Sequence, residues 1–142
     1  MTSLAFRVLG IPRPDSKRSA VINGKARRYV SKPVKQWRAA VAFAYMEAGV
    51  VDAPFDGPVH LECLFYLPRP QRHFNAKGEL LQSAPAYPTT KPDTENLLKP
   101  VKDELTSCNV WRDDAQVVNE TVMKRYASCD ECGVVVCVEE VT

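Results

Sequence analysis

Two acidic residues and a lysine lie close together in sequence near the middle of the chain, where the acids could hold a divalent cation. Asp93 and Glu95 are two residues apart, and Lys99 follows four residues after Glu95. Carboxylate oxygens are the ligands that hard divalent cations such as Mg²⁺ prefer, and such ions keep several waters of their own. A lysine one helical turn after a carboxylate lies on the same helix face. The chemistry open to this group is binding of a divalent cation, with a lysine one turn away.

The spacing of Asp93 and Glu95 sets a condition on the local structure. In a helix, side chains two residues apart point about 200° away from each other, whereas in extended chain they share one face. Both can hold one cation only if the helix starts near Glu95 and Asp93 lies in the lead-in. Pro92 favours this because proline cannot continue a preceding helix. A simpler alternative stays open, in which both acids are ordinary first-turn residues and Glu95–Lys99 is a surface ion pair of little consequence.

A second acidic pair, Asp113 and Asp114, precedes a segment with the pattern of a strand. The pair could form a polar turn before the strand. Alternatively, Asp114, and also Asp113, could add a metal ligand at the strand end. Neither acidic segment contains a histidine or cysteine, so the donor set predicts Mg²⁺ or Mn²⁺ and argues against zinc.

The sequence Cys129-Asp-Glu-Cys132 is a further candidate metal motif. A structural zinc site would need two more ligands, and the chain has no second pair of this spacing, while His60 and His73 are far apart. A turn between two strands is therefore the preferred interpretation of this segment.

Positive and negative charges are unevenly distributed along the chain. Residues 13–38 hold nine Lys and Arg against one acid, whereas residues 103–142 hold nine Asp and Glu against three Lys and Arg. A basic segment beside a carboxylate site indicates a surface for a polyanion, although a solvated surface would give the same count. The cations expected to contact such a polyanion are Arg13, Lys17, Arg18, Lys25, Arg27 and Arg28.

Apolar periodicity predicts the elements that position these groups. We expect strands at residues 4–9, 59–67, 115–122 and 133–141, and a basic hairpin turning at Asn23-Gly24. Helices are expected from Ser31-Lys32-Pro33 to Gly49 and over residues 93–107. Five of the eleven prolines fall in residues 68–92, which are expected to form a long loop. The last two strands are expected to pair as a hairpin. The predicted fold is α+β, a single domain over residues 1–142 with a mixed sheet packed against two main helices.

Composition restricts the class of protein further. The chain has 142 residues, 45% hydrophobic and 25% charged, which is enough to bury a core without cross-links. No apolar run reaches the roughly 20 residues that a membrane span requires, and no secretory signal is expected. Five cysteines without a regular framework favour reduced thiols in a cytoplasm.

The acidic segments together resemble the signature of the RusA endodeoxyribonucleases. The matching stretches are Lys91-Pro-Asp-Thr-Glu-Asn-Leu-Leu-Lys99, Asp103-Glu-Leu105 and Trp111-Arg-Asp-Asp-Ala-Gln-Val117. The family pattern has Asp-x-Asp-Asn-Leu-x-Lys, then Asp-x-Leu, then Asp-Asp-x-Gln-Val. Order, gaps and identities agree over about 35 residues of sequence.

The resemblance implies a fold, an activity and a set of site residues. It implies a small homodimer that binds branched DNA and resolves four-way (Holliday) junctions by paired symmetric nicks with Mg²⁺ or Mn²⁺, leaving 5′-phosphate and 3′-hydroxyl ends. Asp93, Glu95 and Asp114 match the catalytic acids and Lys99 matches the essential lysine. Such proteins are bacterial or encoded by phages and prophages, and act in the bacterial cytoplasm. Glu95 departs from the usual Asp, and the loop at residues 68–92 is long. Two alternatives remain, a flap or fork nuclease of the same fold and an inactive module that binds branched DNA.

Overall fold

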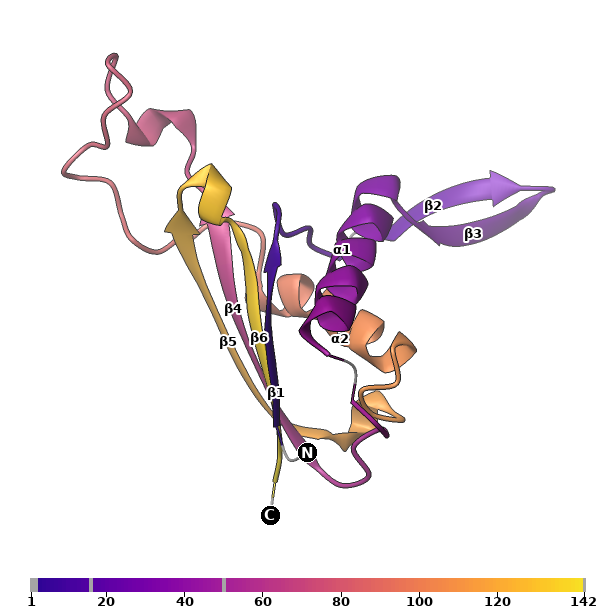
Figure 1. The fold of residues 1–142 in the computed structure, drawn as a ribbon. Coiled ribbons are helices and arrows are strands. Elements are labelled where there is room, and N and C mark those ends of the chain that lie inside the picture. Colours follow the sequence, from indigo (N-terminus) through magenta and orange to yellow (C-terminus); the bar gives the residue numbers. More distant parts are fainter. Residues whose placement is uncertain (1–2, 16, 50, 142) are drawn as a thin grey trace.

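The computed structural model describes residues 3–15, 17–49 and 51–141, without the side chains of residues 17–20. Its strands and helices are β1 (Ser3–Leu9), β2 (Lys17–Ile22), β3 (Lys25–Val30), α1 (Lys32–Ala48), β4 (Val59–Pro68), α2 (Thr94–Ser107), β5 (Val117–Ala127) and β6 (Gly133–Glu140). Three short 3-10 helices are η1 (Gln71–His73), η2 (Asp114–Gln116) and η3 (Cys129–Glu131). The prediction of an α+β fold with a mixed sheet and two main helices is confirmed (Figure 1). Neither helix, among the residues described, is long and apolar enough to cross a membrane.

The main sheet has the order β1-β6-β4-β5, and this order corrects one prediction. β6 pairs antiparallel with β1 and with β4, while β5 pairs parallel with β4 at the sheet edge. The expected hairpin of the last two strands is therefore wrong, because β4 lies between them. The strand composition explains this arrangement. β6 buries Val134, Val136 and Val138 and suits an interior position, whereas β5 carries polar residues such as Asn119 and Glu120 and suits an edge.

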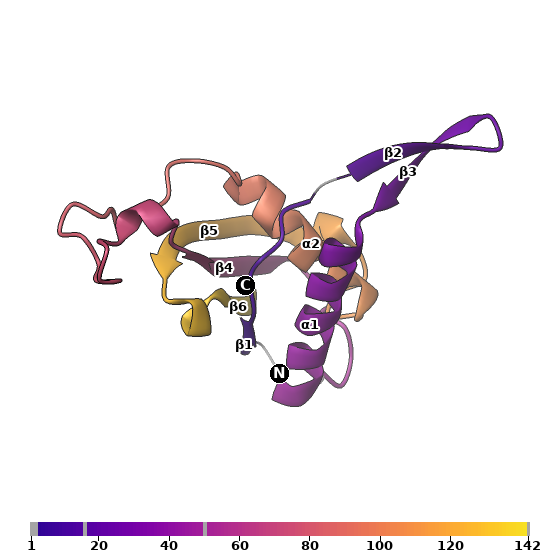
Figure 2. The same ribbon diagram turned by 90° about the horizontal axis from the view of Figure 1, so that it is seen from above.

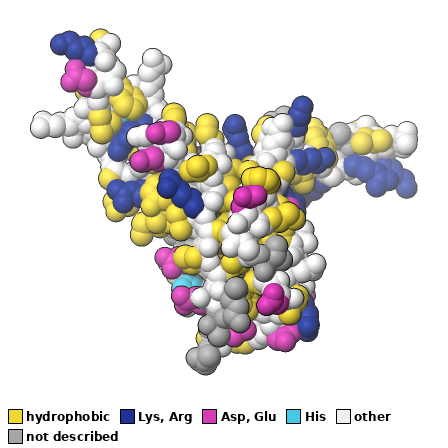
Figure 3. Space-filling view, viewed as in Figure 1, with side chains coloured by type: hydrophobic (Ala, Val, Ile, Leu, Met, Phe, Trp, Pro, Cys, Tyr) yellow, Lys and Arg dark blue, Asp and Glu magenta, His cyan; other side chains and the backbone are white. Residues whose placement is uncertain are grey.

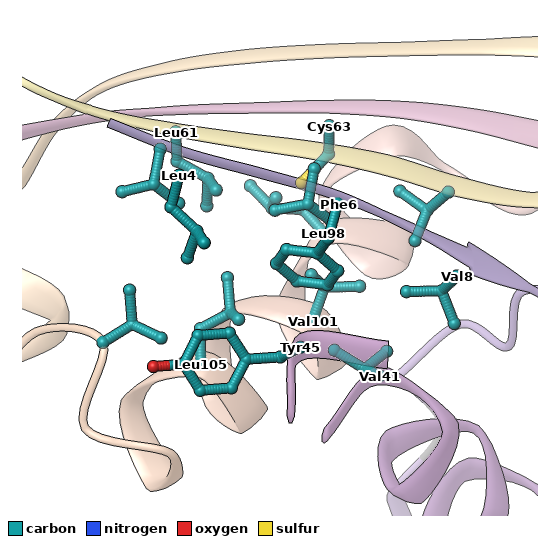
Figure 4. Close-up of a cluster of buried hydrophobic side chains, with 14 of the residues drawn as sticks. Leu4, Phe6, Val8, Val41, Tyr45, Leu61, Cys63, Leu98, Val101 and Leu105 are labelled. Carbon is teal, nitrogen blue, oxygen red and sulfur yellow. The ribbon is translucent and has the colours of Figure 1, made fainter. Parts of the chain in front are cut away.

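Both helices pack on one face of the sheet, and the core fills the space between the layers. Alternate residues of β1 point into it, as the strand's alternation of buried and exposed residues shows. Figure 4 shows side chains of β1, β4, α1 and α2 meeting in this core. The labelled members are Leu4, Phe6, Val8, Val41, Tyr45, Leu61, Cys63, Leu98, Val101 and Leu105. The core holds α2 firmly on the sheet, so the residues at the two ends of α2 have defined positions.

The predicted basic hairpin forms, and it projects away from the sheet and helices. β2 and β3 pair antiparallel around Asn23 and Gly24, whose φ angles are 52° and 75°. These left-handed angles are those of the turn type that Asn-Gly favours. Figures 1 and 2 show the hairpin extending beyond α1 and α2, far from the loop that follows β4.

The loop between β4 and α2 forms a second projection, at the other end of the molecule. It contains η1 and, near its tip, an Asn75 side chain that accepts hydrogen bonds from the backbone N–H groups of Lys77 and Glu79. At its base, buried His73 packs edge-on against the Tyr126 ring, with 4.9 Å between centroids. The loop is thus attached to β5 at its base and extends from there (Figure 2).

Candidate active site

The start of α2 has the geometry that the spacing of its acids requires. The helix begins at Thr94, and Asp93 precedes it with extended angles, φ −70° and ψ 151°. The Asp93 side chain makes no capping hydrogen bond, so its carboxylate is not occupied by the helix end. Both Asp93 and Glu95 are exposed. Two exposed carboxylates therefore stand at the start of α2, where they can hold a cation and its waters.

Because of Pro100, inside α2, a backbone carbonyl of this helix bonds to the segment that follows β1. Proline has no N–H, so the carbonyl of Asn96 lacks its usual donor four residues on. The backbone N–H of Asp15 donates to that carbonyl instead, at 2.7 Å. Asn96 is the residue after Glu95, so this bond anchors the segment that carries Arg13 close to Glu95. Arg13 itself is exposed. Of the predicted DNA-contacting cations, Arg13 is the one that this bond brings toward the acids.

Lys124 of β5 anchors the residues that lead into α2. Its Nζ atom donates to the carbonyl of Thr90 at 2.7 Å and to that of Pro92 at 2.9 Å. The Lys91–Pro92 peptide bond is cis. Asp93 therefore follows a segment that is attached to the sheet, and hydrogen bonds to a charged donor are stronger than neutral ones.

Lys99 lies one turn after Glu95 and is only weakly engaged. Its Nζ atom is 3.4 Å from the Asp103 carboxylate, and its side chain is 45% exposed. An exposed pair at this distance contributes little to stability. The lysine is consequently available to contact a phosphate beside the two acids.

Asp114 lies at the opposite end of α2 from Asp93. Its carboxylate accepts a hydrogen bond from the Thr106 hydroxyl, which in turn accepts one of 2.7 Å from Nε1 of buried Trp111. Thirteen residues separate Asp93 and Thr106, which corresponds to about 20 Å of helix at 1.5 Å per residue. Within the described residues of one chain, no group of three His, Cys, Asp or Glu could hold a metal. In one chain, Asp93, Glu95 and Lys99 thus lie within the first two turns of α2 and its lead-in, whereas Asp114 lies beside the last turn.

Asp113 has a structural role in this region. Its carboxylate accepts from the backbone N–H of Ala115 at 2.8 Å and caps η2. The Gln116 side chain accepts from the backbone N–H of Arg112 and donates to the carbonyl of Phe55 at 2.7 Å. These contacts account for Asp113 without a metal, and they hold Asp114 in a fixed orientation beside Thr106.

The donor set of Asp93 and Glu95 fits a hard divalent cation. Both groups are oxygen ligands, and two carboxylates with several waters are a usual arrangement for Mg²⁺. The Cys129 and Cys132 segment forms η3 between β5 and β6, as the turn interpretation expected. Burial first, and the nearby Cys129, Asp130 and Glu131 next, raise the pKa of the Cys132 thiol, which disfavours the thiolate that binds zinc.

Exposed cations lie on both projections of the molecule. Lys25, Arg27 and Arg28 are exposed on β3. The side chains of Lys17 and Arg18, also predicted to contact DNA, lie outside what the structure describes. Figure 3 shows Lys and Arg side chains along the hairpin, on the opposite projection and between them.

Sequence reasoning missed several positioning residues of this site. Thr106 and Trp111 hold Asp114, and Lys124 holds the lead-in to Asp93. Only the Asp15 contact had a sequence signal, because Pro100 within a predicted helix leaves one carbonyl without a donor. The Lys124 contacts depend on where β5 lies beside the lead-in to α2, and the Thr106 contacts depend on how the chain turns back after α2. No local pattern specifies either arrangement.

Paired acids and a nearby lysine at a helix start, with basic projections around them, are features of enzymes that hydrolyse nucleic acid. The family model described as Endodeoxyribonuclease RusA matches residues 10–139, nearly the whole chain. The chain belongs to this family of endodeoxyribonucleases. It is also similar to an uncharacterized protein of Bacillus subtilis strain 168, YqaN. The two are 34% identical over 148 residues, covering 100% of this chain and 99% of that protein.

Proposed function

We propose that this protein is a nuclease that requires Mg²⁺ or Mn²⁺ and resolves four-way DNA junctions by paired nicks, acting as a homodimer. The observation that carries the proposal is the uncapped Asp93 beside exposed Glu95 at the start of α2, in a chain of the RusA family. The proposed setting is the cytoplasm of a bacterium, with the gene bacterial or phage-borne. The five cysteines are all free, which suits a reducing compartment.

Each site residue has a distinct proposed role in the reaction. Asp93 and Glu95 hold the divalent cation, which when bound supplies charge neutralisation and an activated water. Lys99 stabilises negative charge on the scissile phosphate, since a fixed cation is most effective where charge develops. Arg13, Lys25, Arg27 and Arg28 contact the DNA backbone and position the substrate without reading its sequence. Lys17 and Arg18 of the same hairpin are proposed to share this task.

Asp114 joins this site only if a second copy of the chain provides it. In one chain it lies about 20 Å from Asp93 along α2, whereas Mg²⁺–oxygen distances are about 2.0–2.1 Å. A two-fold dimer can bring the end of α2 in one copy to the start of α2 in the other, and it does so twice by symmetry. The proposed dimer therefore has two equivalent sites, each with Asp93 and Glu95 from one copy and Asp114 from its partner. Two such sites suit a substrate with two equivalent strands.

Cleavage of defined DNA substrates tests this function. End-labelled four-way junction, replication fork, flap and plain duplex are incubated with protein in Mg²⁺, in Mn²⁺ and in EDTA. We expect symmetric cuts in the junction with either metal and none in EDTA. Cleavage in EDTA would contradict the metal mechanism. Preferential cutting of forks or flaps would indicate the alternative specificity, and binding without any cleavage would indicate an inactive module.

A further inference from the structure

A pocket with apolar walls and a basic rim lies next to the carboxylates, formed by three segments of the chain. Its volume is 420 Å³, within the range of sites that bind small molecules. Pro12 from the segment after β1, Pro68 at the end of β4 and Pro92 before α2 contribute rings to its walls. The ring of Tyr126 completes them. None of the roles proposed above for the RusA-type reaction uses this pocket.

The pocket walls are suited to the flat face of a nucleic-acid base. Tyr126 cannot turn freely, because His73 packs against it edge-on and the Arg69 guanidinium lies over its ring at 5.2 Å from the centroid. Arg69 is itself fixed by donating to the carbonyl of Pro85 at 2.7 Å. A preformed apolar surface with a fixed aromatic ring binds an unstacked base without reading its identity.

The charge of the pocket is suited to a phosphate. The residues that line it include Arg69, Arg72 and Lys91 and no acid. Arg72 and Lys91 are exposed, and neither forms an ion pair in the part of the chain that the structure describes. Arg69 already makes the contacts given above. Arg72 and Lys91 are thus the two side chains that can move to meet a ligand anion.

The position of the pocket identifies its ligand as part of the DNA that is cut. Lys91 and Pro92 line the pocket, and Asp93 follows them directly in sequence. Two residues of extended chain span about 7 Å, so the pocket rim lies about one nucleotide from the carboxylates. Lys124 holds the carbonyls of Thr90 and Pro92, so pocket wall and carboxylate are fixed relative to each other.

We propose that this pocket holds one unstacked nucleotide of the cleaved strand, next to the scissile phosphate. The base lies between the proline rings and Tyr126, and Arg72 and Lys91 contact its phosphate. This inference rests on the proposed nuclease function. It explains why the long loop is attached beside α2, because the loop supplies Arg72 and most of the basic rim. Continuous stacking is interrupted at a branch point, which lowers the cost of unstacking a nucleotide there.

Fluorescence of 2-aminopurine tests the proposal directly. Junctions carry the analogue at single positions on either side of the mapped cut, and binding is measured in EDTA so that the strands stay intact. We expect wild-type protein to raise the fluorescence at one position, as the base leaves the stack. Arg72→Ala and Lys91→Ala, tested separately, should lose most of this rise and bind the junction about tenfold more weakly, the usual effect of losing a charged hydrogen bond.

Lys77→Ala is the matched control, because Lys77 is an exposed cation of the same loop that does not line the pocket. It should keep the fluorescence rise and stay within about twofold of wild-type affinity. Ile11→Glu, at a 44% exposed position on the pocket rim, keeps both cations but places an anion there and should also abolish the rise.

Different results would contradict the pocket proposal and the nuclease proposal. If wild-type protein cuts the junction with Mg²⁺ but no analogue position brightens, or if Arg72→Ala and Lys91→Ala brighten fully, the pocket proposal is wrong and the nuclease proposal stands. If wild-type protein cuts no DNA with Mg²⁺ or Mn²⁺, the nuclease function fails whatever the fluorescence shows, and the pocket proposal fails with it.

Discussion

Mixing two inactive variants should restore nicking if each site is shared between two copies of the chain. Asp93→Asn removes a metal ligand from one end of α2, and Asp114→Asn removes one from the other end. Each variant alone should be inactive, since every site of its dimer lacks one carboxylate. A mixed dimer, in contrast, has one site that lacks both carboxylates and one site that retains both. The prediction depends on the separation of the two residues along α2 and on the proposed two-fold dimer.

The structure determines the size of the expected recovery. The separation of about 20 Å is far beyond what side-chain rotation can close, so the two acids of one chain cannot share an ion. If equal amounts of the variants pair at random, about half of the dimers are mixed and each has one intact site of two. Nicking should therefore return to about a quarter of the wild-type level in the unsorted mixture, and to about half of it in purified mixed dimers. A supercoiled plasmid with a cruciform should give nicked circles and few linear molecules, because one site cuts one strand.

The assay requires evidence that mixed dimers exist. The variants are refolded together, each with a different affinity tag, and dimers carrying both tags are purified before the assay. Mixed dimers that remain inactive would refute the shared site and place both acids in the site of one chain after a rearrangement. Full activity of Asp114→Asn alone would remove Asp114 from the reaction altogether.

Three further predictions concern single features of the site. Glu95→Gln should lose nearly all single-turnover nicking. Glu95→Asp should nick about a hundredfold more slowly, because a displacement of about 1 Å misplaces the metal. Near-normal rates for Glu95→Gln would show that Glu95 is only a first-turn helix acid. Replacing Arg27 and Arg28 together with Ala should lower the slope of log affinity against log salt by about 2, and an unchanged slope in a salt titration would place the DNA elsewhere. Thr106→Val should lower the free energy of unfolding by about 1–3 kcal/mol, because Nε1 of buried Trp111 loses its acceptor. It should also reduce nicking, whereas Thr106→Ser should restore both urea stability and rate; equal stability of Val and Ser variants would mean that the hydroxyl has no structural role.

Local sequence patterns were sufficient to predict the main elements and the place where α2 begins. The expected helix at residues 93–107 agrees with α2, and Asp93 lies in the lead-in as its spacing from Glu95 required. The Asn23-Gly24 turn was predictable because few residue pairs accept left-handed angles at both positions. These features depend on near neighbours in sequence, and they therefore appear in the order and spacing of residues.

Tertiary structure alone decided the sheet order and the separation of Asp93 from Asp114. β6 lies between β1 and β4, where its valines are buried. This position depends on whether β6 or β5 is the better interior strand, which neither strand decides alone. Asp114 shares a sequence motif with Asp93, yet α2 is a rigid rod that holds their backbones at opposite ends. The pocket combines prolines from three segments that only the sheet and the Lys124 contacts bring together. The sequence by itself determined which acidic and basic side chains this protein offers for the proposed reaction, whereas the tertiary structure placed Asp93 and Asp114 at opposite ends of α2, because the helix lies between them.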